Sequence, residues 1–262
     1  MIKRIERTFD LINNKGEAYP LSRYNTFSGF FGEVEGLGMD HDATYQKLGN
    51  VYDLLQDNIN QGEISGVVYF QSKYPYQEYA RFVEFCSETP LKLRYVNPVG
   101  EYYRDGVVSK IEKNEDGSPR QAKIVFTAST LWYKEIDETV TGNVIIINSD
   151  SSIESPCCLS FTGISLSNQS ISWEQNVNGT IVMTGKLKNV TVSAQSTIYI
   201  RTDTNPYSIY SQAAGLPNSL YKNSDFSTKR FPFIRKGKNM FIIFSYMPTE
   251  MKIQGRILYE TI

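Results

Sequence analysis

The chain has 262 residues, of which 40% are hydrophobic and 21% are charged, a composition typical of globular proteins and unlike that of disordered chains. Its 27 Lys and Arg residues offset 28 Asp and Glu residues to a formal net charge of -1, which gives no electrostatic reason to expect nucleic acid or an anionic membrane as a partner. A length above the roughly 100 to 150 residues of a common domain predicts two domains.

The first 70 residues predict mainly strands and turns. Residues 9–21 have the pattern of an N-terminal hairpin, with a polar turn between two apolar stretches. Phe30 and Phe31 lie between glycines, which favours a loop. Apolar residues between 48 and 59 recur at helical spacing and predict a short helix, whereas residues 64–70 predict a strand.

An amphipathic helix is the predicted centre of the first domain. Tyr79, Phe82, Val83 and Cys86 occupy positions i, i+3, i+4 and i+7, which places them on one helical face. The helix is expected to end before Pro90, because the residue that precedes a proline avoids the helical conformation. This apolar face is expected to pack within its own subunit.

Strands follow the predicted helix. Residues 91–96 alternate apolar and charged side chains, as in a half-buried strand. Residues 107–111 and 122–128 flank an Asp-Gly pair at positions 116 and 117, which predicts a long hairpin. The sequence thus predicts one helix that covers a mostly antiparallel sheet.

A domain boundary is predicted just after Lys134 and Glu135, where polar residues precede a new apolar run. The division gives domains of residues 1–136 and 137–262. In the second domain, short stretches rich in β-branched and aromatic residues follow one another without a helical segment, which favours a β-sandwich or jelly roll. These stretches are 144–147, 159–161, 171–173, 180–183, 198–200, 240–246 and 251–259, with turns predicted at 178–179 and 236–239.

The sequence contains no recognisable arrangement of catalytic or metal-binding residues. His41 is the only histidine, and it lies between two aspartates without further ligands or a nucleophile motif, so a solvated loop is its expected setting. Cys86, Cys157 and Cys158 have neither metal-ligand nor disulfide-framework spacing and are expected to be reduced and buried. No enzymatic activity, metal or cofactor is predicted.

Two other chemistries rank lower. The carboxylate pairs Glu174 with Asp203 and Glu101 with Asp105 would suit a glycosidase only at a separation that the sequence does not define, so a hydrolase is the last-ranked hypothesis. Residues 228–238 mix basic and aromatic side chains, as a single-strand nucleic-acid surface does, but a solvated hairpin with inward aromatics is preferred.

No apolar run approaches the roughly 20 residues of a membrane helix, and the first seven residues lack the apolar core of a signal peptide. Synthesis in a cytoplasm is therefore expected.

The order of short motifs resembles one protein family over nearly the whole chain. The motifs are Phe9-Asp10-Leu11, the turn 14–17, Gly36-Leu37-Gly38, the helix 76–85, the strand 91–95, the segment 131–135, Leu220-Tyr221, Asp225-Phe226, Phe231-Pro232 and the final alternating strand. In this order they resemble the distal tail protein (Dit) family of long-tailed siphophages. The resemblance implies a mainly β fold with one α-helix: an N-terminal α+β belt domain, built from a β-sandwich, the helix and a β-hairpin, and a C-terminal galectin-like β-sandwich.

The resemblance implies a structural virion protein rather than an enzyme. It would form a six-fold ring at the distal end of a long non-contractile tail and join the tail tube to the host-recognition baseplate. The implied partners are further copies of the chain, the tail tube protein, the tail tip protein or tail-associated lysin, and receptor-binding or other baseplate proteins. Its location would be the virion tail, of a phage or of a phage-derived bacteriocin.

Exposed aromatic side chains are the expected contacts of such a protein, since large rigid side chains suit extended interfaces. The residues assigned to contacts with neighbouring subunits or partners are Phe30, Phe31, Tyr102 and Tyr103, and the hairpin from Tyr102 to Phe126 is expected to reach the neighbouring subunit.

The alternative hypothesis is a carbohydrate-binding module that acts in host attachment through the second domain. Trp173, Tyr207 and Tyr210 are its candidate stacking platforms. The lectin motif that a galectin-like domain would use has His and Arg around Asn-Pro, whereas here Tyr207 follows Asn205-Pro206.

Overall fold

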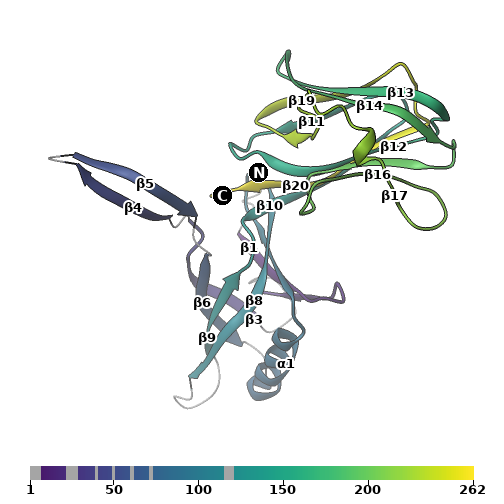
Figure 1. The fold of residues 1–262 in the computed structure, drawn as a ribbon. Helices are drawn as coiled ribbons and strands as arrows, with labels where there is room; N and C mark the ends of the chain where they lie inside the picture. Colours follow the sequence, from purple (N-terminus) through teal and green to yellow (C-terminus); the bar gives the residue numbers. More distant parts are fainter. Residues whose placement is uncertain are drawn as a thin grey trace, which may run out of the picture. The chain divides into compact units, whose positions relative to one another are not determined.

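The computed structural model describes residues 7–21, 29–38, 41–48, 51–59, 62–70, 73–114 and 121–262. It consists of antiparallel β-strands and, within these ranges, one α-helix, so the predicted mainly β class is confirmed (Figure 1). The chain divides into two compact units, of which unit 1 contains residues 1–133 and 259–262 and unit 2 contains residues 134–258. The last four residues thus belong to unit 1, whereas the predicted division placed them in the second domain.

The helix and strands of unit 1 follow the chain in order. They are β1 (Thr8–Ile12), β2 (Ala18–Pro20), β3 (Gly29–Glu35), β4 (His41–Leu48), β5 (Val51–Ile59), β6 (Glu63–Phe70), α1 (Pro75–Ser87), β7 (Leu91–Val96), β8 (Glu101–Asn114) and β9 (Gln121–Ala128). Two longer strands, β10 (Trp132–Val140) and β20 (Glu250–Tyr259), belong to unit 1 at one end and to unit 2 over the rest.

The sheet of unit 1 is centred on β8. One end of β8 pairs with β7, which in turn pairs with β1, and the other end pairs with β9, which pairs with β6 and β3. Side chains alternate in and out along β7, where Leu91, Leu93 and Tyr95 are buried, because successive side chains of a strand point to opposite faces. The predicted N-terminal hairpin, the strand 91–96 and the strand pairing of the long hairpin are confirmed, whereas the turn predicted at Asp116 and Gly117 lies outside the described residues.

Helix α1 begins with Pro75 at its first turn, where the missing N–H costs no hydrogen bond. Phe82 and Cys86 are buried as predicted, but Val83 is 37% exposed. A helix turns about 100° per residue, so Val83 lies well to the side of the Phe82 direction. Phe85 instead lies half-buried on the other flank, with its ring centroid 5.4 Å from that of Tyr19.

Three local predictions for the first 70 residues are wrong. Gly29–Glu35 is the strand β3 and not a loop, since its backbone pairs with β6. The predicted helix at 48–59 is replaced by β5, which pairs along its length with β4 in a two-stranded sheet. His41 is the first residue of β4 rather than part of a loop. In the stretch 48–59, pairing with β4 determines the backbone conformation despite the helical spacing of its apolar residues.

Unit 2 contains two antiparallel sheets, which lie over each other in Figure 1. The first has the order β17 (Asn218–Ser219), β16 (Ser208–Gln212), β15 (Thr197–Arg201), β12 (Ser155–Thr162), β20 and β10. The second has the order β11 (Val144–Ser149), β19 (Gly237–Phe244), β13 (Leu166–Val177) and β14 (Thr180–Val192). Short β18 (Phe233–Ile234) pairs with β12.

Of the two turns predicted in unit 2, the one at 178–179 is confirmed and the one at 236–239 is wrong. Asn178 and Gly179 both have positive φ, at 51° and 91°, and Val177 pairs with Thr180, as in the two-residue turn that the Asn-Gly pair predicts. The turn predicted at 236–239 is instead the start of β19, which begins at Gly237. Consequently the basic and aromatic segment 228–238 is not a hairpin.

The three cysteines are unpaired and buried, as predicted. No helix in the described part of the chain has the length and hydropathy needed to span a membrane.

Candidate functional site

The described residues contain no group of three or more His, Cys, Asp or Glu side chains placed to hold a metal ion. The carboxylates considered for hydrolysis have structural partners. Glu101 accepts a hydrogen bond of 2.7 Å from Arg94 Nε, which is the main reason that the pKa of Glu101 is lowered. Asp105 accepts a hydrogen bond of 2.5 Å from the Tyr133 hydroxyl. Both carboxylates thus anchor neighbouring strands.

The second carboxylate pair is not brought together by the fold. Glu174 lies on β13 in one sheet of unit 2, and Asp203 follows β15 in the other sheet. Both carboxylate oxygens of Asp203 accept hydrogen bonds from Arg201, at 2.9 and 2.8 Å. The resulting ion pair raises the pKa of Arg201.

Two of the four residues assigned to subunit contacts are core residues. Phe31 is 4% exposed and meets the edge of Phe9 at a centroid distance of 5.3 Å. Tyr102 is 3% exposed and meets Tyr259 at 5.2 Å within unit 1. Both predicted contact roles are therefore wrong for the folded subunit, because strand alternation turns these rings inward.

The other two contact residues differ. Tyr103 is half-buried, and its ring stacks on Tyr133 with a centroid distance of 5.9 Å while Lys92 Nζ lies 5.1 Å from its centroid. The backbone of Phe30 pairs with Tyr69 in β3 and β6, whereas the Phe30 side chain lies outside the described residues.

An exposed surface of unit 1 lies on the outer half of the hairpin formed by β8 and β9. Pairing of β8 with β7 ends at Gly106, and beyond it β8 continues to Asn114 beside β9. The outward side chains on this part of the hairpin are Val107, Ser109, Lys110, Glu112 and Lys123, and Val107 is 38% exposed. The opposite face of β9 is buried. This half of the hairpin therefore presents one mixed apolar and charged surface.

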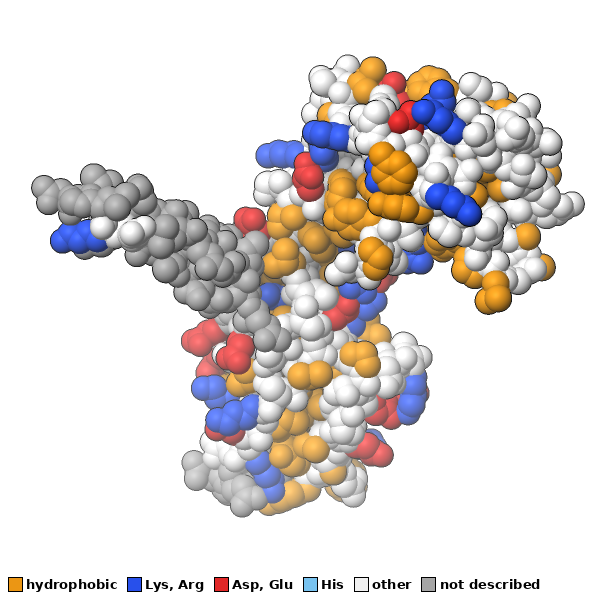
Figure 2. Space-filling model, viewed as in Figure 1, with side chains coloured by type: hydrophobic (Ala, Val, Ile, Leu, Met, Phe, Trp, Pro, Cys, Tyr) orange, Lys and Arg blue, Asp and Glu red, His pale blue; other side chains and the backbone are white. Residues whose placement is uncertain are grey.

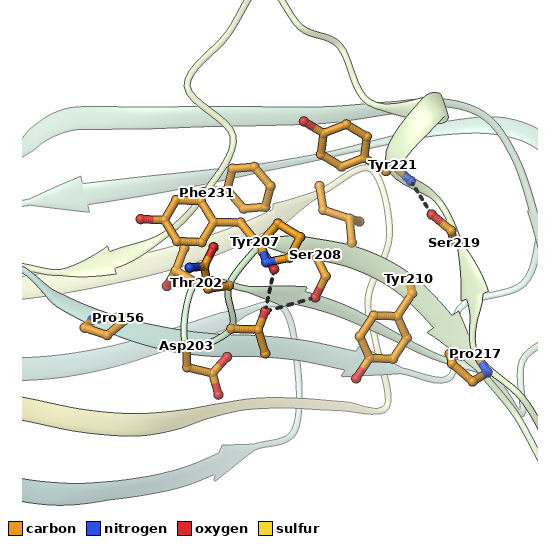
Figure 3. A pocket seen from close by; sticks show the side chains of 14 residues that line it. Pro156, Thr202, Asp203, Tyr207, Ser208, Tyr210, Pro217, Ser219, Tyr221 and Phe231 are labelled. Atoms are coloured by element: carbon orange, nitrogen blue, oxygen red, sulfur yellow. Dashed lines mark hydrogen bonds between the residues drawn. The ribbon is translucent and has the colours of Figure 1, made fainter. Parts of the chain in front are cut away.

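Unit 2 contains a hollow of about 1250 Å³ beside the loop between β15 and β16. Figure 3 shows its lining, which combines aromatic rings with hydroxyl, amide and carboxylate groups from residues 156, 202–210, 217, 219, 221 and 231. Tyr207 and Tyr210, two of the three candidate glycan contacts, both line it. Concave surfaces lined by aromatic rings and a few polar groups are typical of ligand sites.

The loop between β15 and β16, on one side of the hollow, is anchored to the core of unit 2 by Thr202, which is 4% exposed. The Thr202 hydroxyl accepts a hydrogen bond of 2.7 Å from the Cys157 N–H and donates one of 2.9 Å to the Pro232 carbonyl oxygen. The Thr204 hydroxyl donates to the Pro206 carbonyl oxygen at 3.0 Å, within the loop itself. These bonds hold the loop in one conformation, so the hollow is preformed.

Aromatic rings line the hollow from this loop, from β16 and from the segments at Tyr221 and Phe231. Tyr207 is 46% exposed, and its ring centroid lies 5.3 Å from that of Phe231. The guanidinium of Arg230 lies 5.2 Å from the Phe231 centroid and donates a hydrogen bond of 3.2 Å to the Tyr221 hydroxyl. Tyr210 stacks on Tyr199 with a centroid distance of 4.9 Å and an interplanar angle of 19°. Each ring is thus held by a neighbour.

Trp173, the third candidate glycan contact, lies in the core of unit 2. It is 1% exposed, and its Nε1 donates a hydrogen bond of 3.0 Å to the Arg230 carbonyl oxygen. No ligand can stack on this ring in the folded unit, so the prediction for Trp173 is wrong. Tyr221 and Phe231, which the sequence analysis did not assign to a site, take its place beside Tyr207. Their exposure depends on distant segments, and no local pattern indicated it.

Comparison with known proteins gives one family model and several solved structures of similar fold. Residues 8–128 match the family model described as the N-terminal domain of distal tail proteins. No curated protein sequence matches the chain.

Two solved structures are similar over almost the whole chain. A chain from the phage P2 baseplate, in its activated conformation with Ca, has 15% identity and a TM-score of 0.59, with 98% of this chain and 100% of that chain covered. The Dit protein of phage SPP1, described as a paradigm of the hub adsorption apparatus in phages that infect Gram-positive bacteria, has 12% identity and a TM-score of 0.63, with 95% and 99% covered. At these identities the two structures show a shared fold.

Proposed function

Because the chain belongs to the distal tail protein family, we propose that it is a structural protein of a phage tail that assembles into a six-membered ring between the tail tube and the baseplate. The observation that carries this proposal is the family match over residues 8–128, a range that begins with β1 and ends with β9. The match thus spans the strands and the helix of unit 1 as one continuous segment.

The ring is proposed to close through unit 1. A closed ring needs a heterologous interface, in which one surface of a subunit meets a different surface of the next. The outer half of the β8 and β9 hairpin supports this role. Beyond Gly106, β8 no longer pairs with β7, and this part of the hairpin exposes Val107 among charged side chains. Its inner end, with Tyr102 buried, remains part of the subunit core.

The partners proposed for the ring are the tail tube protein on one side and, on the other, the tail tip protein or tail-associated lysin and receptor-binding or other baseplate proteins. The ring would therefore reside in the virion tail after synthesis in the bacterial host. The role of the ring is to connect tube and baseplate mechanically. Such a permanent assembly requires large and well-packed interfaces between subunits.

Mass and shape in solution test this proposal. We expect the purified chain to give a light-scattering mass about six times that of one subunit, and negative-stain images to show a ring with a central opening. The double variant Val107→Glu and Lys123→Glu should leave a folded monomer, because both side chains point outward from the hairpin.

The matched control is Ile181→Glu on β14, which adds a charge at a position in unit 2 that is 56% exposed. It should assemble like the wild type. A wild-type chain that stays monomeric at high concentration, with or without a tail tube partner, contradicts the ring. Assembly of the hairpin double variant at wild-type strength contradicts the assignment of the hairpin.

A further inference from the structure

We propose that the hollow of unit 2 binds an uncharged oligosaccharide, with Tyr207 and Tyr221 as the platforms for its sugar rings. This inference concerns unit 2 and does not depend on ring assembly by unit 1. It rests on the shape of the hollow, the chemistry of its lining and the way its walls are fixed.

Size and exposed rings are the first argument. A hollow of about 1250 Å³ exceeds the volume that a single small molecule fills and suits a chain of several sugar units. Tyr207 and Tyr221 are 46% and 43% exposed, so both rings leave a face accessible to a ligand. A pyranose ring has one face of C–H groups, and such a face packs on an aromatic ring. Figure 2 shows hydrophobic side chains gathered in patches on the visible face of unit 2.

Polar groups between the rings are the second argument. Asp203, Asn205, Ser208 and Ser219 line the hollow with a carboxylate, an amide and two hydroxyls. A sugar hydroxyl both donates and accepts hydrogen bonds, so it can satisfy each of these groups. An aliphatic ligand would displace water from these groups without offering new hydrogen bonds, which costs binding free energy.

Charge defines the ligand further. Among the described residues that line the hollow, Asp203 is the one charged side chain, and Arg201 already engages both of its carboxylate oxygens. Each oxygen retains a lone pair for a further donor. The charges of Asp203 and Arg201 offset each other, and a further cation, the Arg230 guanidinium, packs on the rings of Phe226 and Phe231. We therefore take a neutral saccharide rather than a nucleotide as the occupant.

A proline-rich peptide is the competing occupant, because such peptides dock in aromatic-lined grooves. Its backbone offers carbonyl acceptors and few N–H donors, since proline has none. The Asp203 carboxylate can only accept. A peptide of this kind would add few donors to those that Arg201 already supplies, whereas a saccharide brings several hydroxyl protons.

The walls are already fixed in the free protein, which reduces the entropy lost on binding. Thr202 holds the loop from below through its bonds to Cys157 and Pro232. Arg230 holds Tyr221 from the side, and Phe231 supports Tyr207. The rings of Tyr207 and Tyr221 thus both border the hollow, and Figure 3 shows them along the same side of it, near Phe231.

The test is a binding measurement on the full chain with defined neutral hexasaccharides, namely maltohexaose, cellohexaose and chitohexaose, together with an array of neutral bacterial surface glycans. Calorimetry at millimolar ligand should detect at least one of them. Tyr207→Ala and Tyr221→Ala should each weaken that association by roughly tenfold, while Tyr207→Phe should keep it within about twofold.

The control is Phe244→Ala, which removes a ring that is 40% exposed on β19, away from the hollow, and should leave binding unchanged. Circular dichroism confirms that each variant is folded. The proposal is overturned if no glycan of the array binds, if binding is insensitive to both tyrosine variants, or if a decaproline peptide binds with the same variant dependence in place of the glycans. Ring assembly of the same variants, followed by light scattering, separates this outcome from failure of the proposed tail role.

Discussion

Gly185 on β14 shows how a single missing side chain allows the core of unit 2 to form. A Cβ atom at this position would lie 2.1 Å from Cε2 of Trp173, which is far inside contact distance. Trp173 is fully buried and hydrogen-bonded, so its ring has no free space to enter. The glycine therefore permits the close approach of β13 and β14 at this point.

Gly185→Ala should consequently destabilise unit 2 by about 1 to 3 kcal/mol, the usual cost of forcing extra volume into a packed core. Chemical denaturation followed by Trp fluorescence measures this loss. The matched control is Gly38→Ala, where an added Cβ meets nothing within 4 Å. Equal stability of the two variants would show that the Trp173 ring can move aside.

Cys86 gives unit 1 a stability that depends on pH. Burial raises the pKa of the Cys86 thiol from its ordinary value of 9.0 to about 12. Above pH 9 the unfolded chain therefore loses this proton while the folded chain keeps it. The folded state binds more protons, so the free energy of unfolding falls as pH rises between about 9 and 12.

The expected slope from this one thiol is about 1.4 kcal/mol per pH unit once the unfolded thiol is ionised. Urea denaturation of the wild type and of Cys86→Ala at pH 8 and at pH 10.5 isolates it, because other titrating groups are common to both proteins. Between pH 8 and pH 10.5 the free energy of unfolding should fall more for the wild type than for Cys86→Ala. A difference that stays constant would place the thiol in a more polar environment than the structure does.

At the level of elements, helix α1 distinguishes a buried from an exposed position within one apolar pattern. Phe82 is 0% exposed and meets the rings of Phe70 and Tyr19, whereas its neighbour Val83 is 37% exposed. Phe82→Asp should unfold unit 1 or cost roughly 4 kcal/mol or more, since it removes core volume and buries a charge. Val83→Asp should cost about 1 kcal/mol or less.

Denaturant titration followed by circular dichroism compares the two aspartate variants directly. They differ by one position on the same helix and introduce the same group, so helix propensity and charge are matched. Similar losses in both would mean that Val83 contacts a partner, and then the helix rather than the hairpin would be the candidate contact surface of unit 1.

The elements also show where sequence patterns are sufficient. The strand Leu91–Val96 was predicted with its observed bounds, because alternation over six residues reports a half-buried strand directly. The hairpin of β4 and β5 was missed, although the sequence between them is Gly-Asn at positions 49 and 50, a pair typical of two-residue hairpins. Four apolar residues of the same stretch recur at helical spacing and predict a helix, whereas pairing with β4 makes the stretch a strand.

At the scale of the whole molecule, two units with separate cores predict two unfolding transitions in calorimetry. Each unit buries its own large side chains, with Phe82 and Phe126 in unit 1 and Phe161 and Trp173 in unit 2. Gly185→Ala should lower the midpoint of one transition, and Val83→Asp should affect only the other. A single transition that both substitutions shift together would show that the units unfold as one.

The sequence by itself determined the class of the protein. Strand alternation, the turn pairs and the amphipathic helix follow from local geometry, and they predicted a mainly β chain, although local spacing also predicted a second helix at 48–59 where the structure has β5. The order of short motifs was enough to indicate the family, although each motif consists of ordinary packing and turn residues. Two of the three candidate ligand contacts, Tyr207 and Tyr210, line the hollow of unit 2, and their contact with a saccharide stays a prediction.

Only the tertiary structure decided which aromatic side chains are available to a ligand or a neighbour. Strand alternation separates two faces of a strand but does not reveal which face a distant segment covers. Trp173 is covered by the segment at Arg230, 57 residues further along the chain, and Phe31 and Tyr102 by other strands of unit 1. Tyr207 remains exposed because its supporting ring, Phe231, lies behind it. Burial depends on these long-range contacts, which no local pattern contains.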